Sequence, residues 1–246
     1  MRIIILGSSG LVGNTITKFF LNQSKYETFG FVRDLEKISI FEKKYHKNFI
    51  YMNNILDFEE FEKILIKSKP KLIINCLGIT NKLLKNNFQS IERSLKINAL
   101  FPHKLHTICT KIDARLIHLS TDCVFSGRRG FYKEDDIPDP LDIYGRSKLL
   151  GELNYSNSLT IRKSVIGHEF LSSNGLLEWF LNKKESVEGY KNAIFSGLTV
   201  LELAKIIDQY IIPNKKLSGI IHVAGNPISK YELLHLISIE YQKKIN

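Results

Sequence analysis

The sequence predicts an α/β protein built on a Rossmann-type, doubly wound parallel sheet, followed by a mostly helical C-terminal part. Two observations carry this prediction: strand and helix patterns alternate along most of the chain, and a glycine-rich turn at residues 7–13 joins the first strand to the first helix. The chain has 246 residues and is 43% hydrophobic. It can therefore bury a full core without splitting into independent domains.

Short apolar, β-branched runs alternate with amphipathic stretches, and this alternation defines the elements in order. The first run, Arg2–Leu6, is continuously apolar after its first residue, as expected of a strand buried on both faces. Helices dominate after about residue 163. The expected strands are residues 2–6, 27–32, 48–52, 72–77, 115–120, 159–162 and 219–223, and the expected helices are residues 11–23, 57–68, 87–110, 144–153, 175–182, 199–211 and 229–241.

The glycine-rich turn predicts a dinucleotide site. Gly7-Ser-Ser-Gly10-Leu-Val-Gly13 follows a strand and opens a helix whose apolar face carries Ile16 and Phe20. The first glycine allows the tight turn, the second lets the backbone approach a pyrophosphate, and the third lets the helix pack on the strand. The helix N-terminus offers unpaired N–H groups to phosphates. The expected cofactor contacts in this segment are Gly7, Ser9, Gly10, Leu11 and Val12.

The end of the second expected strand bears on the choice of cofactor. An acidic residue there binds the ribose 2′-OH of NAD, whereas an Arg accommodates the 2′-phosphate of NADP. Arg33 comes first after the strand, and Asp34 follows it. We therefore expect NADP(H) as the preferred cofactor, with NAD(H) as the alternative that Asp34 leaves open.

Tyr144-Gly-Arg-Ser-Lys148 predicts an acid/base catalyst. Residues four apart on a helix lie on the same face, so Tyr144 and Lys148 are neighbours. A phenol has a pKa of about 10, and a nearby ammonium favours the phenolate. We therefore expect Lys148 to lower the pKa of Tyr144 toward neutrality.

These motifs together resemble the extended short-chain dehydrogenase/reductases that act on nucleotide sugars. The segments Ser120-Thr-Asp-Cys-Val-Phe-Ser-Gly127, Tyr132-Lys-Glu-Asp135 and Tyr144-Gly-Arg-Ser-Lys-Leu-Leu-Gly-Glu152 are similar to those of the dTDP-4-dehydrorhamnose reductase family. Cys123 and Ser126 replace the Tyr and Asp usual there. The resemblance covers roughly the whole chain and is looser after about Arg162.

The resemblance implies a role for each matching residue. Thr121, with Ser120 as the second choice, would hydrogen-bond the substrate carbonyl oxygen. Tyr144 would donate the proton, and Lys148 would also bind the nicotinamide ribose. Further cofactor contacts are implied, around the adenine at Asn54 and Ile55, along the cofactor's central part at Cys76, Leu77 and Gly78, and in the proton relay at Asn98.

The resemblance also implies two domains: residues 1–162 bind the cofactor, and residues 163–246 form a small substrate-binding lobe. A strand at 219–224 is expected to return from this lobe to the main sheet. Arg162-Lys163-Ser164 replaces the usual Arg-Thr-Ser and places a charge near the floor of the active site. The chain ends at Asn246, some tens of residues before family members usually stop, which implies either a truncated chain or a reduced lobe.

The function implied is NADPH-dependent reduction of the 4-keto group of a nucleotide-activated 6-deoxysugar, for cell-surface polysaccharide synthesis. One alternative is a nucleotide-sugar epimerase or dehydratase that keeps NAD bound. Dehydratases, however, usually carry a carboxylate pair beside the catalytic Thr, and here Asp122 is followed by Cys123. The other alternative is a non-catalytic, NADP-binding regulatory subunit, which would be expected to lack Thr121, Tyr144 or Lys148. The nucleotide, the sugar and the stereochemistry at C4 stay open.

Composition indicates a cytoplasmic enzyme without nucleic-acid or membrane partners. The net charge is +10, but the lysines are dispersed along amphipathic helices and not clustered with aromatic residues. The three cysteines lack metal-type spacing and fit a reducing compartment. No apolar run is as long as a membrane span. We expect no metal site, assign no role to His118, His168 or His222, and expect a homodimer as the commonest assembly.

Overall fold

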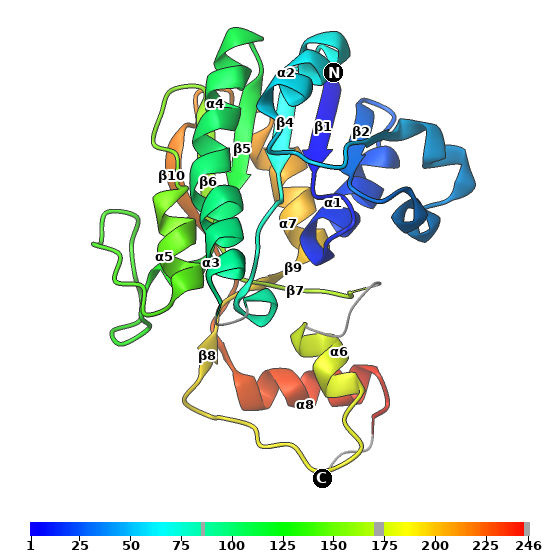
Figure 1. Cartoon of the computed structure of the whole chain (residues 1–246). Helices are drawn as coiled ribbons and strands as arrows, with labels where there is room; N and C mark the ends of the chain where they lie inside the picture. Colours follow the sequence, from blue (N-terminus) through cyan, green and yellow to red (C-terminus); the bar gives the residue numbers. More distant parts are fainter. Residues whose placement is uncertain (85–86, 170–174, 244–246) are drawn as a thin grey trace.

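A parallel seven-stranded sheet forms the centre of the protein, whose computed structural model describes residues 1–84, 87–169 and 175–243 (Figure 1). The strand order is β10-β6-β5-β4-β1-β2-β3, so the winding reverses between β1 and β4. In open sheets of this kind, ligands bind outside the carboxyl ends of the strands at the point of reversal. The strands are β1 (Arg2–Leu6), β2 (Glu27–Val32), β3 (Phe49–Tyr51), β4 (Leu72–Asn75), β5 (Arg115–Leu119), β6 (Ser158–Lys163) and β10 (Gly219–Val223).

Helices cover both faces of the sheet, which confirms the doubly wound Rossmann-type fold. Alternate residues of β1 point to opposite faces: Ile3 and Ile5 join one core with α1 (Leu11–Leu21) and α7 (Val200–Ile206). Ile4 and Leu6 join the other core with α2 (Phe58–Ser68) and α4 (Phe101–Lys111). All four of these β1 side chains are fully buried, which explains why the strand is continuously apolar.

The long helix expected at residues 87–110 contains a distortion. It consists of α3 (Phe88–Ser94), a π-helical segment (Leu95–Leu100) and α4. The helix expected at 199–211 likewise continues from α7 into a π-helical segment (Ile207–Ile211). π segments insert an extra residue per turn and are frequent at functional sites. Short 3-10 turns also occur at Leu35–Ile40, Lys43–Asn48, Asn81–Leu83 and Asp122–Val124.

The C-terminal part is interleaved with the main sheet. β10 pairs in parallel with β6, and α7 packs on α1. The smaller unit packs α6 (Leu176–Leu181) against α8 (Lys230–Glu240) and lies beyond the carboxyl ends of the main strands (Figure 1). Residues 170–174 and 244–246 of the predicted lobe lie outside the described residues. The remaining elements are α5 (Ile143–Leu150), β7 (Val165–Ile166), β8 (Ile194–Phe195), β9 (Leu198–Thr199) and β11 (Ile228–Ser229).

Candidate functional site

The glycine turn after β1 has the tight geometry that its sequence predicts. Gly7 has a φ of +81°, a left-handed conformation that side chains rarely adopt. A Cβ on Gly13 would lie 2.0 Å from the carbonyl oxygen of Gly7, so a side chain there would push α1 off the turn. Gly10 is the N-cap of α1 and provides no capping side chain. The first N–H groups of α1 are therefore available to an anion.

A cleft with a volume of about 610 Å³ opens at this turn and extends past the carboxyl ends of β1, β2, β3 and β4. Of the residues predicted to contact the cofactor, eight line the cleft: Gly7, Ser9, Gly10, Arg33, Ile55, Cys76, Leu77 and Gly78.

Six other predicted contacts do not line this cleft. They are Leu11, Val12, Asn54, Asn98, Tyr144 and Lys148. Asn53 lines it in place of Asn54, whose side chain instead accepts a hydrogen bond from the N–H of Leu56. The one-residue difference arises because β3 ends at Tyr51, one residue earlier than predicted.

The side chain of Asn98 is occupied within the fold. Its amide nitrogen donates to the carbonyl oxygen of Ile79 at 2.9 Å and to Ser147 Oγ at 3.0 Å, and its oxygen accepts from the N–H of Ile79 at 2.8 Å. Asn98 is fully buried in the π segment. It therefore ties the loop after β4 to α5, and within the described structure no hydrogen bond joins its side chain to Lys148.

Two cations stand where β2 opens into the cleft. Arg33 and Lys37 both line it, and within the described residues neither forms an ion pair. Asp34 caps the 3-10 turn at Leu35–Ile40 by accepting a hydrogen bond from the N–H of Glu36 at 3.0 Å. The carboxylate is thus used by the backbone, and the cations are free to meet a ligand. Lys37 was not among the cofactor contacts predicted from the sequence, because the 3-10 turn that carries it has no clear periodicity.

The two hydroxyls of the Ser-Thr pair after β5 have different partners. Ser120 is 1% exposed and donates to Glu152 at 2.8 Å. The Thr121 hydroxyl donates to Asp122 at 3.1 Å and accepts from the N–H of Cys123 at 3.2 Å. The Thr121 side chain also lies close enough to Tyr144 to lower the pKa of its phenol. Of the two hydroxyls predicted, Thr121 is therefore the one beside Tyr144.

Gly145 in α5 and Gly151 at its C-terminal cap let the helix approach its neighbours closely. A Cβ on Gly145 would lie 2.3 Å from the carbonyl oxygen of Cys123. A Cβ on Gly151 would lie 1.9 Å from the carbonyl oxygen of Asn98. Glycine at these positions brings Tyr144 next to the turn that carries Thr121.

Lys148 and Tyr144 are not hydrogen-bonded to each other in the described structure. The Lys148 ammonium is 2% exposed, donates to the carbonyl oxygen of Leu119 at 2.8 Å, and lies 3.4 Å from His118 Nε2. Burial, and then the charge of Lys163, lowers the pKa of Lys148 to about 7.

The expected lowering of the Tyr144 pKa is wrong for this structure. Burial raises the pKa of Tyr144 above its usual value, and the nearby Thr121 side chain opposes this only in part. The carboxylate of Asp122 also raises the pKa of the phenol. Tyr144 is therefore a protonated phenol at neutral pH and suited to donate a proton.

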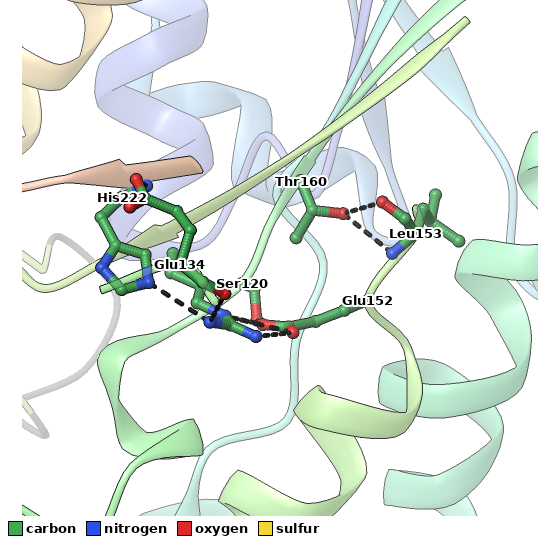
Figure 2. Close-up of polar contacts among 7 residues, drawn as sticks. Ser120, Glu134, Glu152, Leu153, Thr160 and His222 are labelled. Atoms are coloured by element: carbon green, nitrogen blue, oxygen red, sulfur yellow. Dashed lines mark hydrogen bonds and ion pairs between the residues drawn. The ribbon is translucent and has the colours of Figure 1, made fainter. Parts of the chain in front are cut away.

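A buried ion pair holds together the segments that carry the site residues. Arg162 binds Glu152 at 2.8 Å, and both side chains are 4% exposed. Figure 2 shows Ser120, Glu152, Glu134 and His222 meeting around this point. Arg162 also contacts His222 Nε2 at 3.3 Å, and the N–H of His222 donates to Glu134 at 2.7 Å. The ion pair thus joins β5, β6, β10 and the segment that follows α5.

Within the described ranges, no group of three or more His, Cys, Asp or Glu residues is arranged so that it could hold a metal ion. None of the described helices is long and apolar enough to cross a membrane.

Comparisons with known proteins agree with the motifs. The family model described as the RmlD substrate binding domain matches residues 1–243. The dTDP-4-dehydrorhamnose reductase of Aggregatibacter actinomycetemcomitans is 26% identical over 94% of the chain and 76% of its own length. A hypothetical dTDP-4-dehydrorhamnose reductase from Sulfolobus tokodaii has a similar structure, with a TM-score of 0.78 and 28% identity over 100% of this chain and 85% of that one.

The chain spans less than half the length of several other relatives. Methionine adenosyltransferase 2 subunit beta of Bos taurus is 31% identical over 61% of the chain, which corresponds to 41% of its own length.

A dTDP-4-dehydrorhamnose reductase from Bacillus anthracis, solved in complex with NADP, has the same fold, with a TM-score of 0.78 and 24% identity over 100% of this chain and 82% of that one.

Glu152→Gln is expected to lower the free energy of unfolding by about 3 kcal/mol or more, because it leaves the Arg162 charge buried without a counter-ion. Urea unfolding followed by circular dichroism measures the loss. The matched control is Glu92→Gln, which removes an exposed ion pair with Lys96 and should cost no more than about 0.5 kcal/mol. Equal losses in the two variants would contradict the supporting role of the buried pair.

Proposed function

The chain belongs to the RmlD substrate binding domain family, and on that premise we propose that it is an NADPH-dependent reductase of a nucleotide-activated keto sugar. The finer proposal is reduction of the 4-keto group of a 6-deoxysugar. The observation that carries it is that Thr121, Tyr144 and Lys148 gather at the carboxyl end of β5: Thr121 lies beside Tyr144, and Lys148, on the same helix, donates to Leu119. The cleft at the glycine turn opens at the carboxyl ends of the neighbouring strands. The name of the Aggregatibacter relative supports the same substrate class.

The cleft fits a nicotinamide dinucleotide. Space for a pyrophosphate exists at Gly7 and Gly10 because neither residue carries a Cβ, and the uncapped N-terminus of α1 favours the negative charge. In this proposal Arg33 and Lys37 bind the 2′-phosphate of NADPH. In this proposal Ile55 would contact the adenine, and Cys76, Leu77 and Gly78 would contact the central part of the cofactor. When bound, NADPH supplies the hydride that reduces the carbonyl carbon.

The protein's own groups then act on the carbonyl oxygen. Thr121 orients the carbonyl by hydrogen bonding and stabilises the negative charge that develops on its oxygen. Tyr144 is protonated at neutral pH and donates its proton to that oxygen, which completes the alcohol. Lys148, whose pKa burial lowers to about 7, can take up and release a proton near neutral pH, and in this proposal it returns one to Tyr144.

The function is tested by following NADPH oxidation with 4-keto-6-deoxy sugars carried on dTDP, UDP, GDP and CDP. Oxidation with one or more of them is the expected result. Tight NADPH binding without oxidation of any of them would contradict the proposal and favour a non-catalytic subunit.

Tyr144→Phe is expected to lower kcat by about 10²- to 10⁴-fold, since the proton donor is lost. NADPH affinity, followed by fluorescence titration, should change little. Tyr210→Phe is the matched control, because Tyr210 is 68% exposed and lies outside the cleft. A kcat for Tyr144→Phe close to that of the control would rule out this mechanism.

Replacing both Arg33 and Lys37 by Ala is expected to weaken NADPH binding by roughly 10- to 100-fold, because charge-assisted hydrogen bonds to the 2′-phosphate are lost. NADH binding should stay nearly the same, and isothermal titration with each cofactor measures the difference. Lys43→Ala, on the next 3-10 turn and outside the cleft, serves as the control. Equal weakening of NADPH and NADH would exclude 2′-phosphate recognition by these two cations.

The rate of reduction is expected to fall as the pH rises through about 7. Lys148, whose pKa burial has lowered to about 7, loses its proton above that pH, whereas Tyr144, whose pKa is raised, keeps its own. A profile of kcat between about pH 5.5 and 9 measures this decline. Lys148→Arg should lower kcat across the whole range, since a guanidinium stays protonated and cannot pass a proton to Tyr144. A wild-type profile that is flat to pH 9 would contradict the assignment.

A further inference from the structure

Beneath Lys148 lies a buried chain of polar side chains from three elements. Lys148 on α5 is 2% exposed, and His118 on β5 and Asn75 on β4 are fully buried. Lys148 Nζ lies 3.4 Å from His118 Nε2, and His118 Nδ1 lies 3.0 Å from Asn75 Nδ2. Asn75 and His118 are direct partners in the parallel register of β4 and β5, so the sheet holds them side by side.

The backbone decides which way the Asn75 amide faces. The N–H of Leu77 donates to Asn75 Oδ1 at 3.1 Å. An amide nitrogen at that position would place two donors against each other and leave both unpaired, so the oxygen must stay there. The amide nitrogen of Asn75 therefore faces His118 and donates to Nδ1.

This orientation specifies the tautomer of His118. A neutral imidazole carries one N–H, and since Nδ1 accepts from Asn75, the hydrogen resides on Nε2. Burial, and then the charge of Lys148, lowers the pKa of His118 well below its usual value, so the ring stays neutral. The Nε2–H group points at Lys148.

An Nε2–H donor interacts oppositely with the two forms of Lys148. A neutral amine has a lone pair and can accept this hydrogen, whereas an ammonium has none and is repelled. The amine form is therefore held against His118. The ammonium form is turned away from it and keeps the carbonyl oxygen of Leu119 as its acceptor.

Other charged and titratable groups act on this chain from the surrounding elements. Lys163 at the end of β6 lowers the pKa of Lys148, while Glu152 after α5 and Cys76 after β4 raise it. His103 on α4, together with Lys163, lowers the pKa of His118. All of these groups are present in the wild type and in the His118 variant. A difference in the titration of Lys148 between the two proteins therefore reports the effect of His118 alone.

We propose that His118, oriented by Asn75, is a positioning residue that holds the neutral amine of Lys148 and repels the ammonium, which keeps the carbonyl oxygen of Leu119 as its acceptor. During turnover, which rests on the proposed reductase function, this contact would set the pH at which Lys148 gives up its proton. Without His118, Lys148 would titrate at higher pH, and the position of its Nζ would be less well defined.

The first test measures the tautomer in the free protein, without substrate. In ¹⁵N-histidine-labelled protein, the nitrogen shifts of His118 should show a neutral ring protonated at Nε2 between about pH 5.5 and 8.5. Assignment comes from the spectrum of His118→Asn. A ring protonated at Nδ1, or one that becomes doubly protonated in this range, would overturn the proposal.

The second test follows the protonation of Lys148 through its ¹³Cε shift in the free protein. His118→Asn, whose shorter side chain can still accept from Asn75 but does not reach Lys148, should raise the titration midpoint from about 7 by roughly one pH unit or more. His235→Asn makes the same substitution on the exposed face of α8 and should leave the midpoint unchanged. An unchanged midpoint in His118→Asn would also overturn the proposal.

A turnover measurement separates this proposal from the function itself. If a keto-sugar substrate is found, the decline of kcat in His118→Asn should move to higher pH by the same amount, with KM nearly unchanged. Should no substrate be reduced, the two spectroscopic tests still decide the role of His118, and only the reductase function fails. A decline that stays at the wild-type pH in an active His118→Asn variant would reject the coupling to catalysis.

Discussion

The buried ion pair between Arg162 and Glu152 is the constraint on which the site depends. Both side chains are 4% exposed, so neither charge can be satisfied by water if its partner moves away. Glu152 also accepts the hydroxyl of Ser120, which fixes the first residue after β5. Thr121 is the next residue, and Lys148 lies one helical turn before Glu152. Thr121 and Lys148 are therefore both positioned by one ion pair, which joins β6 to the segment following α5.

Close backbone approach is the second constraint, and it explains a motif that acid/base chemistry alone does not. The glycines of Tyr144-Gly-Arg-Ser-Lys-Leu-Leu-Gly-Glu152 lie where a Cβ would overlap a carbonyl oxygen, of Cys123 at one end and of Asn98 at the other. The π segment that carries Asn98 brings that carbonyl against Gly151. The motif thus combines two reactive residues with two residues that allow α5 to dock.

Burial drives the pKa values of the two reactive groups in opposite directions. It raises the pKa of the phenol of Tyr144 and lowers that of the ammonium of Lys148, since each is pushed toward its neutral form. Tyr144 is then a proton donor, and Lys148 a group that exchanges a proton near neutral pH. Lys163, at the end of β6, adds a second positive charge that strengthens the effect on Lys148. This balance favours a reductase over a reaction that starts from a phenolate.

The sequence by itself determined the fold class and was sufficient to propose Thr121, Tyr144 and Lys148 as the reactive residues, because hydrophobic period, a glycine turn and helical spacing are local properties of the chain. The residue ranges of β1, β2 and β10 agree with prediction for this reason. Only the tertiary structure decided that Ser120 turns inward to Glu152, that the Tyr144 pKa rises, and that His118 lies against Lys148. These outcomes depend on burial and on contacts between residues about thirty positions apart, which no local pattern encodes.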